Sequence, residues 1–293
     1  MFRIIRLRSC RFSSRTHVSK RAYNVSASSD VEAFLKPAGS SNPGVTYLSL
    51  NRPKTKNAIS VNLLQQFRDC LEQVRFDKDT RVLIVNSTSD NAFCSGADLI
   101  ERKSMTQPQV NKFLVDLRSA FSALEGLPFP TIAAIDGPAL GGGLEMALSC
   151  DLRVAGFAAT KIGLTETKLG IIPGAGGTQR LTRLIGVPKA KDLIFTAQAL
   201  TAHQALDYGV IDYVSEEGKT GLDRALQLAR EISLNGPLAV RAAKQAISRA
   251  MEFPLEAGLD FERASYEPLL RSKDRIEALE AFKAKRPPQF KGE

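Results

Sequence analysis

The feature that most constrains this chain is the segment TIAAIDGPALGGGLEMALSCD, residues 131–151. Its first five residues, 131–135, have the composition of a β-strand and lead into Asp-Gly-Pro and then three consecutive glycines, 141–143. The residues that follow, Leu144 to Leu148, have helical composition. The sequence therefore predicts a strand, a tight turn and the N-terminus of a helix.

This turn has the properties of a site for a negatively charged oxygen atom. Glycines lack a Cβ atom, so a ligand can approach the backbone closely. The first N–H groups of a helix have no acceptor within the helix, and they lie at the positive end of its dipole. Glu145 adds a carboxylate in the first helical turn. Taken alone, the glycines are equally explained by close packing, and the glutamate by the helix dipole.

Two more glycine-containing segments accompany this turn. FCSGAD, residues 93–98, precedes it, and IIPGAGGTQR, residues 171–180, follows it shortly after Glu166. In their order and spacing the three segments resemble the enoyl-CoA hydratase/isomerase (crotonase) superfamily, and the likeness extends from about Val45 to the C-terminus. Within that family the sequence is most similar to the branch of mitochondrial methylglutaconyl-CoA hydratases. AAIDGPALGGGLE, GLTETKLGIIPG and AFKAKRPPQFKGE carry this closer likeness.

The other patterns of the chain predict an α/β fold. Residues 45–50 alternate like a strand, Ser60 can cap a helix that reaches about Phe76, and residues 81–86 read as the next strand. A helix is predicted from roughly residue 107 to 124. Strands that alternate with helices favour a parallel sheet covered by helices.

The resemblance adds an architecture to these elements. It implies a crotonase-like spiral of β-β-α repeats over residues 44–232. It also implies a C-terminal helical region, residues 233–293, that packs subunits into homotrimers, often paired as homohexamers.

Positive charge is concentrated at the N-terminus. The chain has 40 Lys and Arg against 31 Asp and Glu. Residues 1–29 contain seven of the basic residues and no acid, which leaves 33 basic against 31 acidic residues elsewhere. A segment rich in Arg and Ser and free of acids is typical of a mitochondrial transit peptide. We therefore predict a transit peptide at residues 1–23, a mature start near Asn24 and a location in the mitochondrial matrix. Residues 24–43 are interpreted as a linker or a loose first strand.

Composition excludes several other classes of function. The four cysteines show no CxxC spacing and support neither a zinc site nor a disulfide framework. One of the two histidines lies in the predicted leader, which leaves too few for a Ser-His-Asp triad or a multi-histidine metal site. No uninterrupted apolar run of about 18 residues is present, so no membrane span is expected. We expect no metal and no cofactor, since CoA is part of the substrate.

The resemblance assigns the chemistry of hydration to four residues. Addition of water to an α,β-unsaturated thioester pushes negative charge onto the carbonyl oxygen, which two backbone N–H donors can stabilise. By motif match, these oxyanion-hole donors come from Ser95 and Gly142. Glu145 and Glu166 match the two family glutamates that share one water as acid and base. Two acids favour a hydratase, because family isomerases keep one or neither.

Substrate-binding positions are also implied by the resemblance. Lys54 and Lys56 are expected near the adenine and phosphates of CoA, although a solvated basic turn is the simpler interpretation of their loop. Asp98 is expected to cap or brace its turn, and Gly174 to admit the acyl chain. Lys285 matches a family lysine that reaches the CoA of a neighbouring subunit, and Tyr266 lies where the family often has an aromatic residue beside the acyl pocket. The complete set of expected binding residues is Lys54, Lys56, Ala97, Asp98, Gly141, Gly174, Tyr266 and Lys285.

The predicted activity is therefore hydration of an acyl-CoA. The favoured reaction converts 3-methylglutaconyl-CoA to 3-hydroxy-3-methylglutaryl-CoA in leucine catabolism, and the alternative is a general short-chain enoyl-CoA hydratase of fatty-acid β-oxidation. For the distal carboxylate of the favoured substrate the sequence offers only Lys168, for which a solvent-facing position on a strand is the simpler interpretation. The two glutamates argue against a non-catalytic subunit. RNA, which some family members bind, is not expected as a partner, because the helix at 61–72 holds one basic residue against two acids.

Overall fold

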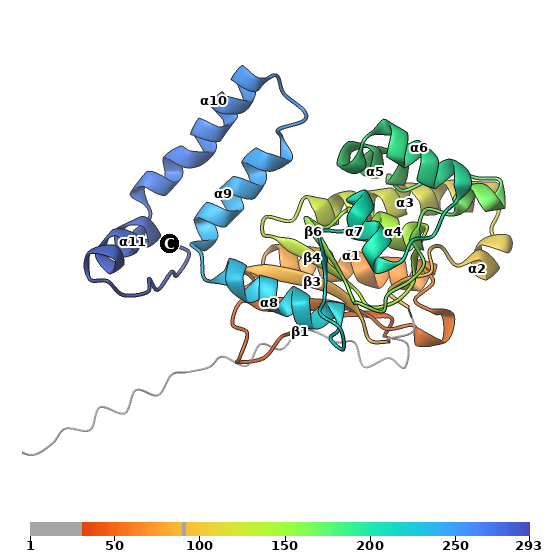
Figure 1. Ribbon diagram of the computed structural model, residues 1–293, viewed down its shortest axis with the longest axis horizontal. Coiled ribbons are helices and arrows are strands. Elements are labelled where there is room, and N and C mark those ends of the chain that lie inside the picture. The colour runs from red at the N-terminus through yellow and green to blue at the C-terminus, as the bar shows by residue number, and fades with distance from the viewer. Residues whose placement is uncertain (1–30, 90–91) are drawn as a thin grey trace, which may run out of the picture.

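A six-stranded sheet forms the centre of the computed structural model, which describes residues 31–89 and 92–293 (Figure 1). The strands follow the order β1-β2-β3-β4-β6-β8. All neighbouring pairs are parallel except β1 and β2, which are antiparallel. The strands are β1 Ala33–Pro37, β2 Val45–Leu50, β3 Val82–Ser87, β4 Thr131–Ile135, β6 Leu152–Ala155 and β8 Tyr213–Val214.

A second, smaller layer of pairing turns the fold into a spiral. β5 (Ala139–Leu140) pairs in parallel with β7 (Ile162–Gly163). Single bridges extend this layer from Cys94 to Ala139 on one side and from Ile162 to Leu200 on the other. Successive turns of the chain therefore place one segment in the main sheet and the next in the small layer before a helix follows. The predicted spiral of β-β-α repeats is confirmed.

Helices cover both faces of the main sheet. Leu83 of β3 belongs to the apolar cluster that includes residues of α1 (Val61–Arg75) and α3 (Gln107–Glu125), whereas Ile84 belongs to the cluster that includes residues of α8 (Gly221–Ser233). Successive residues of a strand point to opposite faces, so a strand covered on both sides is apolar throughout. The helices are α1 Val61–Arg75, α2 Leu99–Lys103, α3 Gln107–Glu125, α4 Gly142–Leu148, α5 Gly177–Ile185, α6 Val187–Thr196, α7 Ala202–Tyr208, α8 Gly221–Ser233, α9 Pro237–Ser248, α10 Leu255–Tyr266 and α11 Lys273–Lys283, with short 3-10 helices η1 Pro53–Thr55, η2 Glu166–Leu169 and η3 Glu267–Arg271.

Local signals in the sequence placed several of these elements correctly. The Ser60 hydroxyl accepts the Leu63 N–H and caps α1, as predicted. Of the two interpretations of residues 24–43, the structure has a strand over residues 33–37, whose side chains Ala33 and Leu35 are buried against the core. The predicted transit peptide, residues 1–23, lies outside the described residues.

The C-terminal helices α9, α10 and α11 form an arm that stands apart from the sheet (Figure 1). α10 folds back along α9, with the rings of Phe253 and Phe261 centred 6.1 Å apart. Several large apolar side chains on this arm are exposed, among them Met251, Leu255 and Phe282. A surface of this kind is typical of a protein–protein interface. Across the described ranges, no helix has both the length and the apolar character needed to span a bilayer.

The three glycines at the start of α4 have different structural reasons. Gly141 has a φ of +51°, a conformation that side chains rarely adopt. Gly143 packs against backbone, since a Cβ atom there would lie 2.1 Å from the carbonyl oxygen of Cys94. At Gly142 a Cβ atom would find ordinary contacts, the nearest 3.4 Å away at Ile59. Close packing therefore explains Gly143, and a positive φ explains Gly141. Neither reason applies to Gly142.

We predict that Gly143→Ala destabilises the protein by about 3 kcal/mol or more, because the colliding atom belongs to the backbone and cannot rotate away. The matched control is Gly258→Ala in α10, where a Cβ atom meets nothing within 4 Å. This control should gain about 0.5–1 kcal/mol from helix propensity. Urea denaturation of both variants measures the difference, and equal midpoints would contradict the assignment.

Candidate active site

The three glycine-containing segments meet at one cavity of ≈ 440 Å³. Its lining comes from residues 95–97, from α2 and α3, from the start of α4, from η2 and from the segment that follows η2. Most of the site residues predicted from the sequence reach this cavity. Those in its lining are Ser95, Ala97, Gly141, Gly142, Glu145, Glu166 and Gly174.

Other predicted binding residues lie outside the cavity. Lys54 in η1 and Lys56 just after it are exposed and do not contribute to the lining. Tyr266, at the end of α10, is 58% exposed and lines a separate hollow among the C-terminal helices, so it does not flank the cavity within one chain. Lys285 is exposed beyond α11, and its contact with a neighbouring subunit stays a prediction.

Pairing in the small layer brings the two glutamates together. Gly141 donates its N–H to the carbonyl oxygen of Gly163 at 3.0 Å, which holds the glycine turn against the end of β7. Glu145 projects from the first turn of α4, and Glu166 opens η2 three residues beyond β7. A Cβ atom on Gly141 would lie 3.2 Å from Oε1 of Glu166. The glycine thus leaves room for this carboxyl group.

Backbone N–H groups surround the carboxylate of Glu145. Its Oε1 accepts hydrogen bonds from the N–H groups of Ala175 and Gly177, both at 2.8 Å. The side chain is only 2% exposed. Burial raises the pKa of Glu145, and the two N–H donors oppose that rise without cancelling it. Segment 171–180 therefore fixes the orientation of this carboxyl group.

The surroundings of Glu166 differ from those of Glu145. Burial, with a smaller contribution from the nearby Glu145 carboxylate, raises the pKa of Glu166 to about 7. Its Oε2 is buried and has no hydrogen-bond partner within the described part of the chain. Buried polar atoms are nearly always hydrogen-bonded, so an unpaired one at a cavity wall marks a place for water or substrate.

The structure corrects one predicted oxyanion-hole donor. The N–H of Ser95 donates to the carbonyl oxygen of Lys56 at 3.0 Å and is not available to a ligand. The N–H of Ala97, two residues on, has no acceptor among the described residues, and neither has that of Gly142. The two groups are close, since a Cβ atom on Gly142 would lie 3.7 Å from the Ala97 nitrogen. Gly96, with a φ of +94°, turns the backbone between Ser95 and Ala97, so their N–H groups meet different partners.

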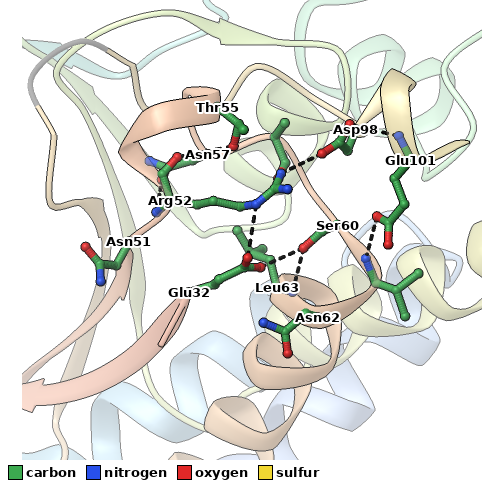
Figure 2. A network of polar contacts seen from close by, with 12 residues as sticks. Glu32, Asn51, Arg52, Thr55, Asn57, Ser60, Asn62, Leu63, Asp98 and Glu101 are labelled. Atoms are coloured by element: carbon green, nitrogen blue, oxygen red, sulfur yellow. Dashed lines mark hydrogen bonds and ion pairs between the residues drawn. The ribbon is translucent and has the colours of Figure 1, made fainter. Parts of the chain in front are cut away.

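An ion-pair network fixes the bend that contains Ala97 (Figure 2). Arg52 contacts Glu32 at 3.0 Å and Asp98 at 2.7 Å. Asp98 also caps α2 by accepting the N–H groups of Ile100 and Glu101, as predicted for this residue. Burial alone would raise the pKa of Asp98, but Arg52 and the helix N–H groups outweigh burial and lower it. Asp98 therefore positions the bend while lying outside the cavity lining.

The sequence analysis missed part of the lining. Leu114 and Leu117 of α3 and Arg102 of α2 face the cavity, and none of them belongs to a recognisable motif. Apolar periodicity predicts that Leu117 is buried but does not reveal against which segment. In the ranges that the structure describes, no cluster of three or more His, Cys, Asp or Glu side chains could hold a metal ion.

Comparisons with known proteins found similarity over most of this chain. The human mitochondrial methylglutaconyl-CoA hydratase is 46% identical over 277 residues, which cover 94% of this chain and 81% of that protein. An enoyl-CoA isomerase/hydratase of Mycosarcoma maydis is 50% identical over 268 residues, covering 89% of this chain and 97% of its own. The crystal structure of an enoyl-CoA hydratase from Bacillus anthracis matches with a TM-score of 0.86 and 44% identity, over 90% of this chain and 100% of that one.

The family profile described as enoyl-CoA hydratase/isomerase matches residues 40–293. This range includes the spiral, the cavity and the C-terminal arm. The chain therefore belongs to the enoyl-CoA hydratase/isomerase family.

Proposed function

We propose that this enzyme of the enoyl-CoA hydratase type converts 3-methylglutaconyl-CoA to 3-hydroxy-3-methylglutaryl-CoA. The observation that carries hydration is the meeting, at one cavity, of two buried carboxyl groups and two backbone N–H groups that have no acceptor in the described part of the chain. The choice of substrate is supported by the mouse, rat and human methylglutaconyl-CoA hydratases, at 45% to 46% identity. A general short-chain enoyl-CoA hydratase is the second candidate, supported by the likeness to the Bacillus anthracis enzyme.

In this proposal the thioester oxygen binds between the N–H groups of Ala97 and Gly142. Attack of water at C3 of the substrate moves electrons toward that oxygen, and donors already fixed in place stabilise the charge without reorganising. One such donor is typically worth about 3 kcal/mol in the transition state. Gly142 also lies at the N-terminus of α4, where the helix dipole favours negative charge.

The two glutamates divide the proton transfers between them. Glu145, held by two N–H donors, acts as the base that receives a proton from the attacking water as the oxygen bonds to C3. Glu166, whose pKa is raised to about 7, supplies the proton that C2 takes up. Exchange with solvent then restores the starting protonation states. No cofactor beyond the CoA of the substrate takes part.

We further propose where and in what form the enzyme works. The mitochondrial relatives and the basic leader, residues 1–23, support a location in the matrix. The exposed apolar surface of residues 233–293 supports a homotrimer or homohexamer, in which Tyr266 and Lys285 would reach a neighbouring subunit's substrate. Lys54 and Lys56 remain the candidates for the CoA phosphates.

RNA binding gains no support from helix α1. It carries two basic residues, Arg68 and Arg75, and two acidic residues, Asp69 and Glu72. Arg68 also lies 3.5 Å from Asp116. This helix therefore offers no basic face for the release of counterions from a nucleic acid.

Replacing either acid tests the mechanism. Glu145→Gln and Glu166→Gln should each lower kcat by about 10²–10⁴-fold, because each removes one proton transfer while nearly preserving side-chain shape. The binding of acyl-CoA should be largely retained. Steady-state hydration of crotonyl-CoA and 3-methylglutaconyl-CoA, with binding measured by calorimetry, separates the two effects. Near-normal turnover by either variant would show that the acids are misassigned.

The pH profile tests the division of roles. Because the proton donor must be protonated, kcat/KM should fall as the pH rises through about 7, the raised pKa of Glu166. At lower pH the rate should fall again as Glu145 loses its negative charge. In Glu166→Gln the residual rate should show no alkaline limb near pH 7. A wild-type profile that stays level from pH 6 to about pH 9 would contradict this division.

A pair of substitutions at Gly142 tests the oxyanion hole. Gly142→Pro removes the N–H at the first position of a helix, where proline is otherwise well tolerated. Gly142→Ala keeps the N–H and reports the effect of an added Cβ atom alone. We predict that kcat of the proline variant is about 10²–10³-fold below that of the alanine variant. Equal rates would exclude the Gly142 N–H as a donor.

A further inference from the structure

Among the described residues, Arg102 is the one positively charged residue in the lining of the candidate active-site cavity. It lies near the end of α2 and is partly buried. Apart from the carboxyl groups of Glu145 and Glu166, the lining consists mostly of apolar residues. They include Leu99, Leu114, Leu117, Leu169, Ile171 and Ile172.

The acidic residues nearest to Arg102 in sequence are engaged elsewhere (Figure 2). Asp98 pairs with Arg52 and caps α2, and Glu101 accepts the N–H of Val61 at 3.0 Å. Within residues 31–89 and 92–293, the guanidinium of Arg102 makes no ion pair or side-chain hydrogen bond. A partly buried cation without a partner is costly, so its place in a ligand cavity points to a negatively charged group on the ligand.

We propose that Arg102 binds a carboxylate at the far end of the substrate's acyl group. This inference rests on the proposed function and defines its substrate class as short α,β-unsaturated acyl-CoA thioesters with a terminal carboxylate. The N–H groups of Ala97 and Gly142 fix the thioester, and Lys54 and Lys56 lie outside the lining. The cavity therefore encloses the acyl part of the substrate, and Arg102 supplies a positive charge to the cavity lining.

The chemistry of the two groups is matched. A guanidinium is planar and can donate two parallel N–H bonds to one carboxylate, which gives geometric selectivity as well as charge. Lys168, the candidate from the sequence, is exposed in η2 and does not line the cavity. Arg102 replaces it as the residue that selects for a terminal carboxylate.

Binding of saturated acyl-CoA esters tests the inference without turnover. Calorimetry compares glutaryl-CoA, which has a terminal carboxylate, with butyryl-CoA, which has none. Wild type should bind glutaryl-CoA about 10-fold or more tightly than butyryl-CoA. Arg102→Met should lower that preference by about 10–100-fold, the range for a charge-assisted hydrogen bond. Arg102→Lys should restore part of the preference, and Lys103→Met, the exposed neighbour, should leave it unchanged.

Two outcomes would overturn the role of Arg102. Equal weakening of both ligands by Arg102→Met would indicate packing or a contact with a CoA phosphate, and an unchanged preference would exclude the residue. Turnover of wild type on crotonyl-CoA and 3-methylglutaconyl-CoA tests the proposed function separately. A wild type inactive on both would overturn that function, while the ratio of the two binding constants would still decide the role of Arg102.

Discussion

The site depends on one backbone hydrogen bond in the small layer of the spiral, from the N–H of Gly141 to the carbonyl oxygen of Gly163. This bond holds the start of α4 beside the end of β7. Glu145 on one segment and Glu166 on the other then open into the same cavity. Two short strands, β5 and β7, therefore bring the two carboxyl groups of the candidate site together, although they form a sheet separate from the main one.

Burial gives the two carboxyl groups different properties. Both lose most of their contact with water, which raises both pKa values, but only Glu145 has two N–H donors that favour its charged form. Glu166 instead has a buried oxygen without a hydrogen-bond partner among residues 31–89 and 92–293, and its pKa is raised to about 7. The same residue type thus meets two different environments, and in the proposed mechanism Glu145 serves as the base and Glu166 as the acid. Arg102 adds a cation to the same cavity, and within the described ranges it has no acidic partner.

Motifs in the sequence predicted a large part of this arrangement. The central strand over 131–135, the cap at Ser60 and the joint location of Glu145, Glu166 and Gly174 depend on local composition and family pattern, and the structure has all of them. The prediction that Ser95 is an oxyanion-hole donor was wrong, because a sequence motif does not reveal which of its backbone N–H groups faces the ligand. Because Gly96 has a positive φ, the N–H of Ser95 donates to the carbonyl oxygen of Lys56, whereas that of Ala97 does not. Arg102 was missed because it belongs to no motif.

The sequence by itself determined which segments could form strands and helices, where glycine was required, and which acids could serve hydration. These properties are local, since they follow from periodicity, capping and the absence of a Cβ atom. Only the tertiary structure decided which N–H groups keep no acceptor, how far each glutamate's pKa rises, and that Tyr266 lies away from the cavity of its own chain. Those properties depend on contacts between segments distant in sequence, and burial and hydrogen-bond pairing are fixed only when the segments pack together.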